Sequence, residues 1–163
     1  MTRTNRTVAL LALLLLFSLY SFAQSTTVYD AAGIKFTFPT VDWYVDGEAP
    51  SMHGVLMQAG MFYFDSYTTE PGLEKSIDAF TKLSRTAKGY CCNQRVPFKT
   101  KSGLEGYRTV YIITWSDGRS FAFTQYWFQL DEHVIVSLVF TSPAGLAEIY
   151  RPAFDRIAET GHK

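Results

Sequence analysis

The chain has 163 residues, with 15 basic and 15 acidic side chains, and 16% of its residues are aromatic. The balanced charge argues against a nucleic-acid-binding surface, which needs clustered Lys and Arg. The high apolar and aromatic content argues against intrinsic disorder.

The first 23 residues have the three parts of a secretory signal peptide. Arg3 and Arg6 provide a basic start, residues 8–17 form an apolar run, and residues 21–23 are a small-x-small triplet. A membrane-spanning helix needs about 20 apolar residues, and this run is shorter. We therefore predict cleavage after Ala23, an exported protein that is periplasmic or secreted, and a single domain over residues 24–163. No segment of that domain is apolar enough to span a membrane.

The first predicted strands lie at residues 26–29 and 34–38. Asp30 and Gly33 bound a short polar connection that predicts a hairpin, with Gly33 taking a positive φ. Residues 55–57 and 61–67 are either two further strands or one long strand bent at Ala59 and Gly60, and the sequence leaves both readings open.

The first helix is predicted to begin at residues 69–71, where Thr, Glu and Pro suit a helix start. An apolar stripe at helical spacing follows, formed by Leu73, Ile77, Phe80 and Leu83. Such a stripe is typical of a helix that packs on a core. Gly89 is the predicted end of this helix.

An antiparallel meander is predicted from strands at residues 94–99, 107–115, 121–130 and 134–141. Asp117 and Gly118 are a strong hairpin signal between the second and third of these strands. In the last two strands both alternating faces are largely apolar, whereas a sheet open to water on one side alternates apolar with polar residues. We therefore expect both faces of the central sheet to be covered, which makes three layers.

The last predicted element is a C-terminal helix. Ser142 is a candidate N-cap and Pro143 a candidate first helical residue. The predicted buried stripe consists of Leu146, Ile149, Tyr150, Ala153 and Ile157. Gly161 marks the predicted end of the helix.

Two adjacent cysteines, Cys91 and Cys92, are the candidate redox residues. A disulfide between neighbours needs a distorted peptide bond, because consecutive Cα atoms are closer than disulfide geometry prefers. The alternative is a pair of thiols that are free or paired with another molecule. A thiol-redox or metal-handling function centred on these residues is therefore one hypothesis.

The sequence predicts no catalytic, cofactor-binding or metal-binding residues. His53 and His133 have no metal-ligand spacing, and the sequence contains no nucleophile elbow, phosphate-binding loop or dinucleotide fingerprint. Aromatic side chains that are candidates for a ligand groove or a protein interface are Trp43, Tyr44, Trp115 and Trp127.

Three motifs, in order along the chain, resemble the PsbP-like superfamily, which includes photosystem II extrinsic subunits, a eukaryotic Ran-binding import factor and bacterial DcrB-like exported proteins. They are residues 33–39 followed by Trp43, residues 104–108 leading into a strand, and residues 134–143 leading into the terminal helix with Tyr150, Phe154 and Ile157. The resemblance implies an antiparallel sheet between helices and a non-catalytic accessory or binding role.

Together these patterns predict an α+β domain with a central antiparallel sheet of about six or seven strands in a PsbP-like three-layer arrangement. One covering helix follows the first strands and the other is C-terminal. The predicted function is that of an exported, non-catalytic accessory or binding protein without a cofactor. Its predicted partner is an envelope or secreted protein or a small apolar ligand.

Overall fold

A computed structural model describes residues 25–45, 51–54, 60–67, 72–85 and 89–163, with only the backbone described for residues 44, 45, 51–54, 61–67, 83, 84 and 91–93. The predicted leader, the predicted strand at 55–57 and the predicted helix start at 69–71 lie outside these residues. No helix within the described ranges has the length and apolar character to cross a membrane.

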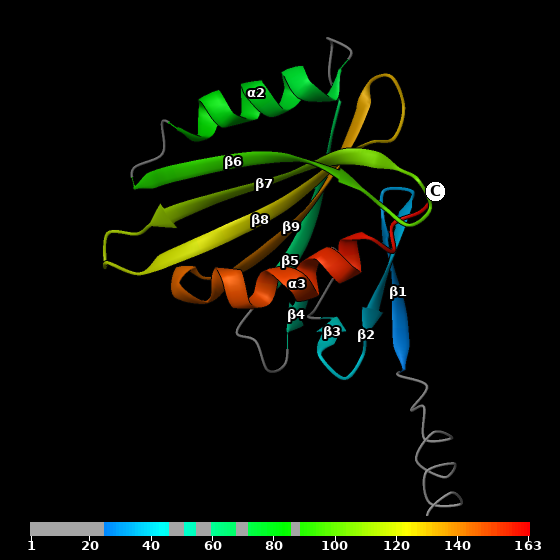
Figure 1. Ribbon diagram of the computed structural model, residues 1–163, viewed down its shortest axis with the longest axis horizontal. Coiled ribbons are helices and arrows are strands. Elements are labelled where there is room, and N and C mark those ends of the chain that lie inside the picture. The colour runs from blue at the N-terminus through cyan, green and yellow to red at the C-terminus, as the bar shows by residue number, and fades with distance from the viewer. Residues whose placement is uncertain (1–24, 46–50, 55–59, 68–71, 86–88) are drawn as a thin grey trace, which may run out of the picture.

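The described residues form two antiparallel sheets and two α-helices (Figure 1). The smaller sheet pairs β1 (Thr26–Ala31) with β2 (Ile34–Pro39). The larger sheet has the order β3-β4-β5-β9-β8-β7-β6. Its strands are β3 (Trp43–Val45), β4 (Ser51–Gly54), β5 (Gly60–Tyr67), β6 (Tyr90–Lys99), β7 (Glu105–Thr114), β8 (Ser120–Gln129) and β9 (Val134–Pro143). The α+β class and the antiparallel pairing are confirmed, but the first hairpin forms a separate sheet that the sequence did not distinguish.

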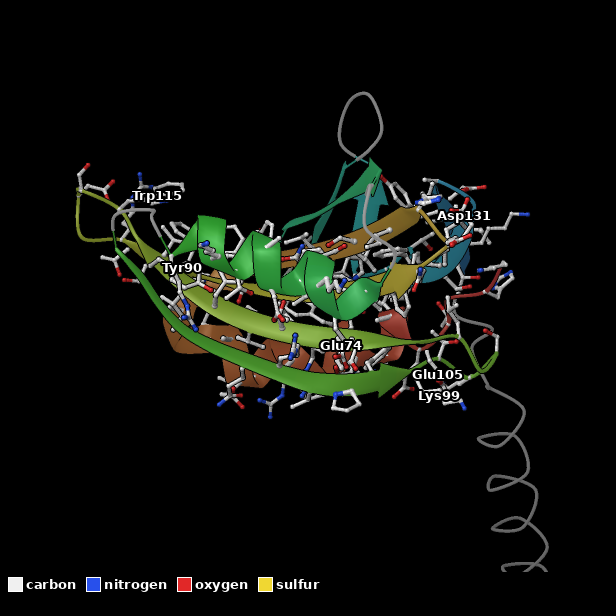
Figure 2. The ribbon with its side chains drawn as sticks, turned by 90° about the horizontal axis from the view of Figure 1, so that it is seen from above. Glu74, Tyr90, Lys99, Glu105, Trp115 and Asp131 are labelled. Atoms are coloured by element: carbon white, nitrogen blue, oxygen red, sulfur yellow. The ribbon has the colours of Figure 1, made fainter. Side chains whose placement is uncertain are left out.

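The two helices lie on opposite faces of the larger sheet, as Figure 1 and Figure 2 both show. Helix α2 (Leu73–Ser84) packs on Trp127 through Phe80, with ring centroids 5.0 Å apart. Helix α3 (Ala147–Ala158) packs on the other face, where the Phe154 and Phe140 rings stack at 4.6 Å. Because successive side chains of a strand point to opposite faces, neighbours such as Tyr126 and Trp127 belong to different layers.

The larger core lies between the sheet, α3 and the β1–β2 hairpin. Fourteen of the described residues are buried in it, among them Phe36, Phe38, Trp43 and Phe154. Trp43 is 1% exposed and meets both Phe38 and Phe140 edge to face, at 5.5 and 5.6 Å. The aromatic side chains of the hairpin therefore cover this core beside α3. These contacts hold the hairpin on the domain, although its strands do not pair with the larger sheet.

Turn predictions agree with the backbone. Ala32 and Gly33 have φ values of 51° and 97°, and Asp30 Oδ1 accepts a hydrogen bond from the Gly33 amide at 2.7 Å. Positive φ at both positions of a two-residue connection is the pattern of a type I′ hairpin turn. Gly118 has φ 84° at the tip of the β7–β8 hairpin, as the Asp117-Gly118 signal predicts.

The start of the terminal helix differs from the prediction. Ser142 lies in β9, not at an N-cap, and a 3₁₀ turn η1 (Ala144–Leu146) precedes α3. The β8–β9 ladder continues to the pair between Phe121 and Pro143, so strand pairing extends the sheet over the residues that resemble a cap. The chain cannot begin the helix until it leaves the sheet.

The buried face of α3 is also rotated from the predicted stripe. Ile149 is 68% exposed, whereas Phe154, Ile157 and Ala158 are buried. Gly161 is buried beyond the end of α3, where an added Cβ would lie 2.7 Å from a ring carbon of Phe36. This glycine allows the chain to approach the hairpin closely, a role different from the predicted helix stop.

The predicted strand at 61–67 is found within β5, and Met52 of β4 pairs with Met61 of β5 in an antiparallel ladder. Residues 55–59 lie outside the described residues, so the choice between two strands and one bent strand stays a prediction. The strand β6 begins at Tyr90, four residues earlier than predicted, and its register with β7 shifts between Cys91 and Gln94. The sequence signal for a strand is weak there because the polar run at 93–95 interrupts the apolar pattern.

Candidate functional site

A cleft of about 730 Å³ opens between the start of α2 and the ends of β6 and β7. We call it the α2 cleft. It is lined by Gly72, Leu73, Glu74, Lys75, Pro97, Phe98, Lys99, Glu105, Gly106, Tyr107 and Gln129. Because its walls come from a helix and from two strands more than twenty residues later, only the tertiary structure assembles it.

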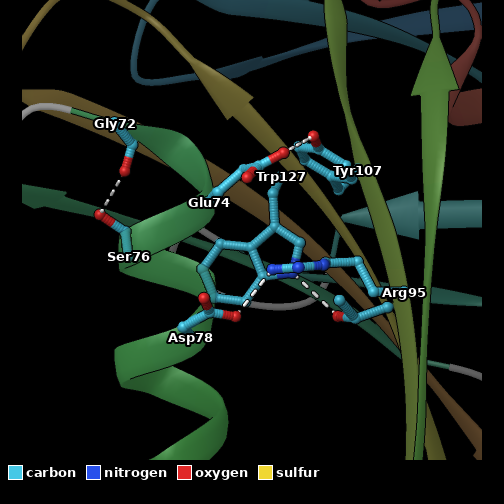
Figure 3. A network of polar contacts seen from close by, with 8 residues as sticks. Gly72, Glu74, Ser76, Asp78, Arg95, Tyr107 and Trp127 are labelled. Carbon is cyan, nitrogen blue, oxygen red and sulfur yellow. Dashed lines mark hydrogen bonds and ion pairs between the residues drawn. The ribbon is translucent and has the colours of Figure 1, made fainter.

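Tyr107 and Glu74 join the two walls of the cleft. The Tyr107 hydroxyl donates a hydrogen bond to Glu74 Oε1 (Figure 3). That hydrogen bond, followed by burial and by the negative charge of Glu74, raises the pKa of Tyr107 above its usual value of 10.0. Tyr107 is therefore a neutral hydrogen-bond donor at physiological pH, further from proton transfer than an ordinary tyrosine.

Arg95 and Asp78 form a second link between α2 and the sheet, one helical turn further along α2. The Arg95 Nη1 and Asp78 Oδ1 atoms are 2.8 Å apart (Figure 3). The Arg95 guanidinium also lies over the Tyr107 ring, 5.6 Å from its centroid. Arg95 thus connects the helix to β7 although it lies on β6, the edge strand of the sheet.

Lys99 and Glu105 close the end of the cleft where β6 turns into β7. Their Nζ and Oε1 atoms are 3.0 Å apart, and both side chains are largely exposed. Figure 2 shows these two residues at one end of the molecule, beyond Glu74, whereas Tyr90 and Trp115 lie toward the other end. Charges that pair in water contribute little to stability, so this ion pair can open to other partners at small cost.

The floor beside the cleft is built around Trp127. Its indole Nε1 donates to Thr109 Oγ1 at 2.8 Å, and the side chain is 2% exposed. Trp127 forms a small core cluster with Ile77 and Ile135, and Leu73, Phe80 and Tyr107 pack against this cluster. The apolar side chains of α2 therefore hold the helix in place, while its charged residues Glu74 and Lys75 line the cleft.

A second polar network lies on the opposite face, under α3. Arg108 Nη1 contacts both carboxylate oxygens of Asp155 at 2.8 Å, and the Tyr126 hydroxyl donates to Asp155 Oδ1 at 2.7 Å. Burial, and then the charge of Asp155, raise the pKa of Tyr126. Arg108 Nε is buried without a hydrogen-bond partner among the described residues, but the contacts of Arg108 and Tyr126 with Asp155 join α3 to β7 and β8.

The aromatic residues that the sequence predicts for a ligand groove or an interface differ in how far their side chains are buried. Trp43 and Trp127 are buried and pack in the two core clusters. Trp115 is 47% exposed at the tip of the β7–β8 hairpin, where it lines a hollow of about 640 Å³ with Gly89, Thr114 and Ser116. The Arg119 guanidinium lies over the Trp115 ring at 5.3 Å. The side chain of Tyr44 lies outside the described residues.

The cysteine pair is placed only by its backbone. Cys91 and Cys92 lie in β6, and the Cys91 backbone pairs with Ile112 of β7. Their side chains are outside the described residues, so the choice between a vicinal disulfide and two thiols stays a prediction. Among the side chains that are described, no group of three or more His, Cys, Asp and Glu residues is placed to hold a metal ion.

Sequence reasoning did not identify the residues that line the α2 cleft. Glu74 and Asp78 stand out in the sequence only as the polar side of an amphipathic helix, and Tyr107 only as the first residue of a strand. A signal does exist in the charged side chains Arg95 and Lys99, because charges and Pro97 on one strand are typical of a protected sheet edge. That signal indicates an edge but not the helix beside it.

Comparisons with known proteins identify the fold. No family model and no curated protein matches this sequence. Among solved structures, the chain is similar to PA94 of Pseudomonas aeruginosa, a protein of unknown function, with a TM-score of 0.55 and 15% identity over 83% of this chain and 94% of that one. It is also similar to the cyanobacterial PsbP protein CyanoP of Synechocystis sp. PCC 6803, with a TM-score of 0.55 and 12% identity over 88% of this chain and 95% of that one. The chain therefore has a PsbP-like fold.

Proposed function

We propose that this PsbP-like protein is an exported, non-catalytic binding protein that holds a segment of an envelope or secreted protein in the α2 cleft. The observation that carries the proposal is the pairing of polar side chains between α2 and the sheet, at the cleft and one helical turn beyond it. Glu74 is bonded to Tyr107, and Asp78 is paired with Arg95. Paired groups shape a surface for recognition, whereas acid or base catalysis needs a group whose pKa lies near the working pH.

The size and lining of the cleft support a protein segment as the occupant. Leu73, Pro97 and Phe98 give it apolar surface, and Glu74, Lys75, Lys99 and Glu105 give it charges of both signs. A specific interface combines an apolar centre with a polar rim of this kind. The predicted leader supports the location, because it directs the chain to the compartment in which such a partner is found.

Site-specific photo-crosslinking tests this proposal. A photoreactive phenylalanine analogue at Lys75, on the exposed rim of the cleft, is expected to give a reproducible adduct with one protein in intact cells. The same analogue at Ile149, which is exposed on the opposite face of the molecule, is the matched control and is expected to give none. The Lys75 adduct should disappear when Lys99→Glu reverses the charge at the cleft end. Equal adducts from both positions, or none from Lys75, would contradict the proposal.

A thiol-based function is the second candidate. The observation that favours it is the shift of register between Cys91 and Gln94 in β6, because irregularities in strands are over-represented next to functional sites. The double variant Cys91→Ser/Cys92→Ser should then change the sensitivity of cells to oxidants while the protein remains folded. Unchanged oxidant sensitivity with unchanged protein levels would remove this candidate.

A further inference from the structure

The sheet face beneath α2 carries a row of buried polar side chains. Thr109, Gln125 and Ser137 lie on the three adjacent strands β7, β8 and β9 and are 2%, 0% and 0% exposed. On the opposite face the same strands bury Tyr126, Leu138 and other apolar side chains against α3. The row calls for a reason, because burying polar groups is unfavourable unless all are hydrogen-bonded.

Gln125 is incompletely bonded in this row. Its Nε2 donates to Ser137 Oγ at 2.6 Å, and its Oε1 is buried with no hydrogen-bond partner among the described residues. Rotating the amide by 180° does not solve the problem, since Oε1 would then accept from Ser137 and Nε2 would be left unpaired. One polar atom of Gln125 thus lacks a partner in either orientation, which destabilises the fold.

Aromatic rings surround this amide. Phe123 and Trp127 are the same-face neighbours of Gln125 along β8, and the Tyr111 ring stacks on Phe123 at 5.0 Å. Phe80 of α2 spans the row, with ring centroids 6.0 Å from Tyr111 and 5.0 Å from Trp127. A molecule reaching Gln125 would therefore meet flat apolar surfaces and one unpaired hydrogen-bonding atom.

The α2 cleft gives a route to this place. Gln129, Trp127 and Gln125 follow one another on the same face of β8, and Gln129 lines the cleft. Trp127 and the helix above it separate the cleft from Gln125. Helix α2 is held there by a small apolar cluster and by polar contacts at its exposed rim, so a modest shift of the helix would open the path.

We propose that the layer between α2 and β8 is a second binding site, which takes a small flat aromatic molecule that carries one hydroxyl group. The hydroxyl pairs with the free atom of the Gln125 amide, and the ring packs against Phe80 and Phe123 once α2 shifts. A hydroxyl can donate or accept, so it satisfies either orientation of the amide. An aromatic body suits the walls because ring pairs gain from offset and edge-to-face contacts. This site does not depend on the protein partner proposed for the cleft.

Titration of the purified protein with p-cresol and with toluene tests the proposal, because the two probes have similar shapes and differ in the hydroxyl group. Binding is followed by the indole N–H signal of Trp127 in NMR spectra, assigned with a Trp127→Phe variant. We expect saturable binding of p-cresol at least tenfold tighter than that of toluene. Equal affinity for the two probes, or no saturable shift, would overturn the proposal.

Variants of the polar row separate hydrogen bonding from general apolar binding. Gln125→Leu should abolish the preference for p-cresol, and Gln125→Leu/Ser137→Ala, which removes both polar partners, should abolish it while raising the thermal midpoint. Gln94→Leu, at an exposed glutamine of β6 outside the row and the cleft, is the control and should keep the preference. A preference that survives in the folded double variant would overturn the assignment to Gln125.

Discussion

Replacing Phe154 by alanine tests whether α3 packs on the sheet through the face that the structure gives it. Phe154 is 0% exposed, stacks on Phe140 at 4.6 Å and meets Trp43 edge to face at 6.3 Å. A buried phenylalanine removes about 200 Å² from water. At about 25 cal/mol per Å² its burial contributes about 5 kcal/mol, of which alanine retains a part. We expect Phe154→Ala to lower the free energy of unfolding by about 3–5 kcal/mol.

The matched control is Ile149→Ala on the same helix. Ile149 is 68% exposed, so its truncation should change the free energy of unfolding by less than about 0.5 kcal/mol. The periodicity of the sequence alone predicts the opposite, because it places Ile149 in the buried stripe. The pair of variants therefore distinguishes the packed structure from the sequence pattern.

Urea unfolding followed by circular dichroism measures both effects on one scale. The expected loss at Phe154 corresponds to a fall in the thermal midpoint of roughly 10–20 °C. A cost above about 2 kcal/mol at Ile149, or below about 1 kcal/mol at Phe154, would show that α3 is rotated from the described position.

Three further predictions concern turns and backbone contacts. Ala32→Asn should stabilise the protein by about 0.5–1 kcal/mol in urea unfolding, because Asn tolerates the positive φ that Ala32 adopts at a cost. Gly106→Ala should destabilise it by about 3 kcal/mol, since an added Cβ would lie 2.0 Å from the Trp127 carbonyl oxygen; an effect below 1 kcal/mol would mean that β7 and β8 are not so close. Backbone hydrogen bonds from His133 and then Val134 lower the pKa of Asp131 in the folded protein. The ionised carboxylate therefore stabilises the fold above the unfolded pKa of about 3.9. This stabilisation is lost as the pH falls through the lower pKa of the folded state. The stability difference between wild type and Asp131→Asn should thus be full at pH 6 and shrink below pH 4, and a difference independent of pH would contradict the assignment.

The candidate site was less predictable than the fold, for a reason that particular residues make clear. Tyr107 and Glu74 are 33 positions apart and Arg95 and Asp78 are 17 apart, so no local pattern links the members of either pair. Each residue in isolation looks like an ordinary surface or strand position. The unsatisfied amide of Gln125 is equally invisible in the sequence, because only the burial of three adjacent strands beneath α2 deprives it of water.

Features set by neighbouring residues were correctly predicted from the chain itself. The hairpins at Gly33 and Gly118 follow from the freedom of glycine at positive φ. The two apolar faces of β8 and β9 correctly predicted helices on both sides of the sheet.

Only the tertiary structure decided the long-range choices. The first hairpin packs as a separate sheet on the aromatic core, β9 extends through Ser142 where a helix cap was expected, and α3 buries Phe154 while Ile149 faces water. Each of these outcomes is a competition between a local preference and contacts with distant segments. The distant contacts prevail because a fully buried aromatic ring or a continued strand ladder stabilises the fold by more than a cap or a helical stripe of similar hydrophobicity.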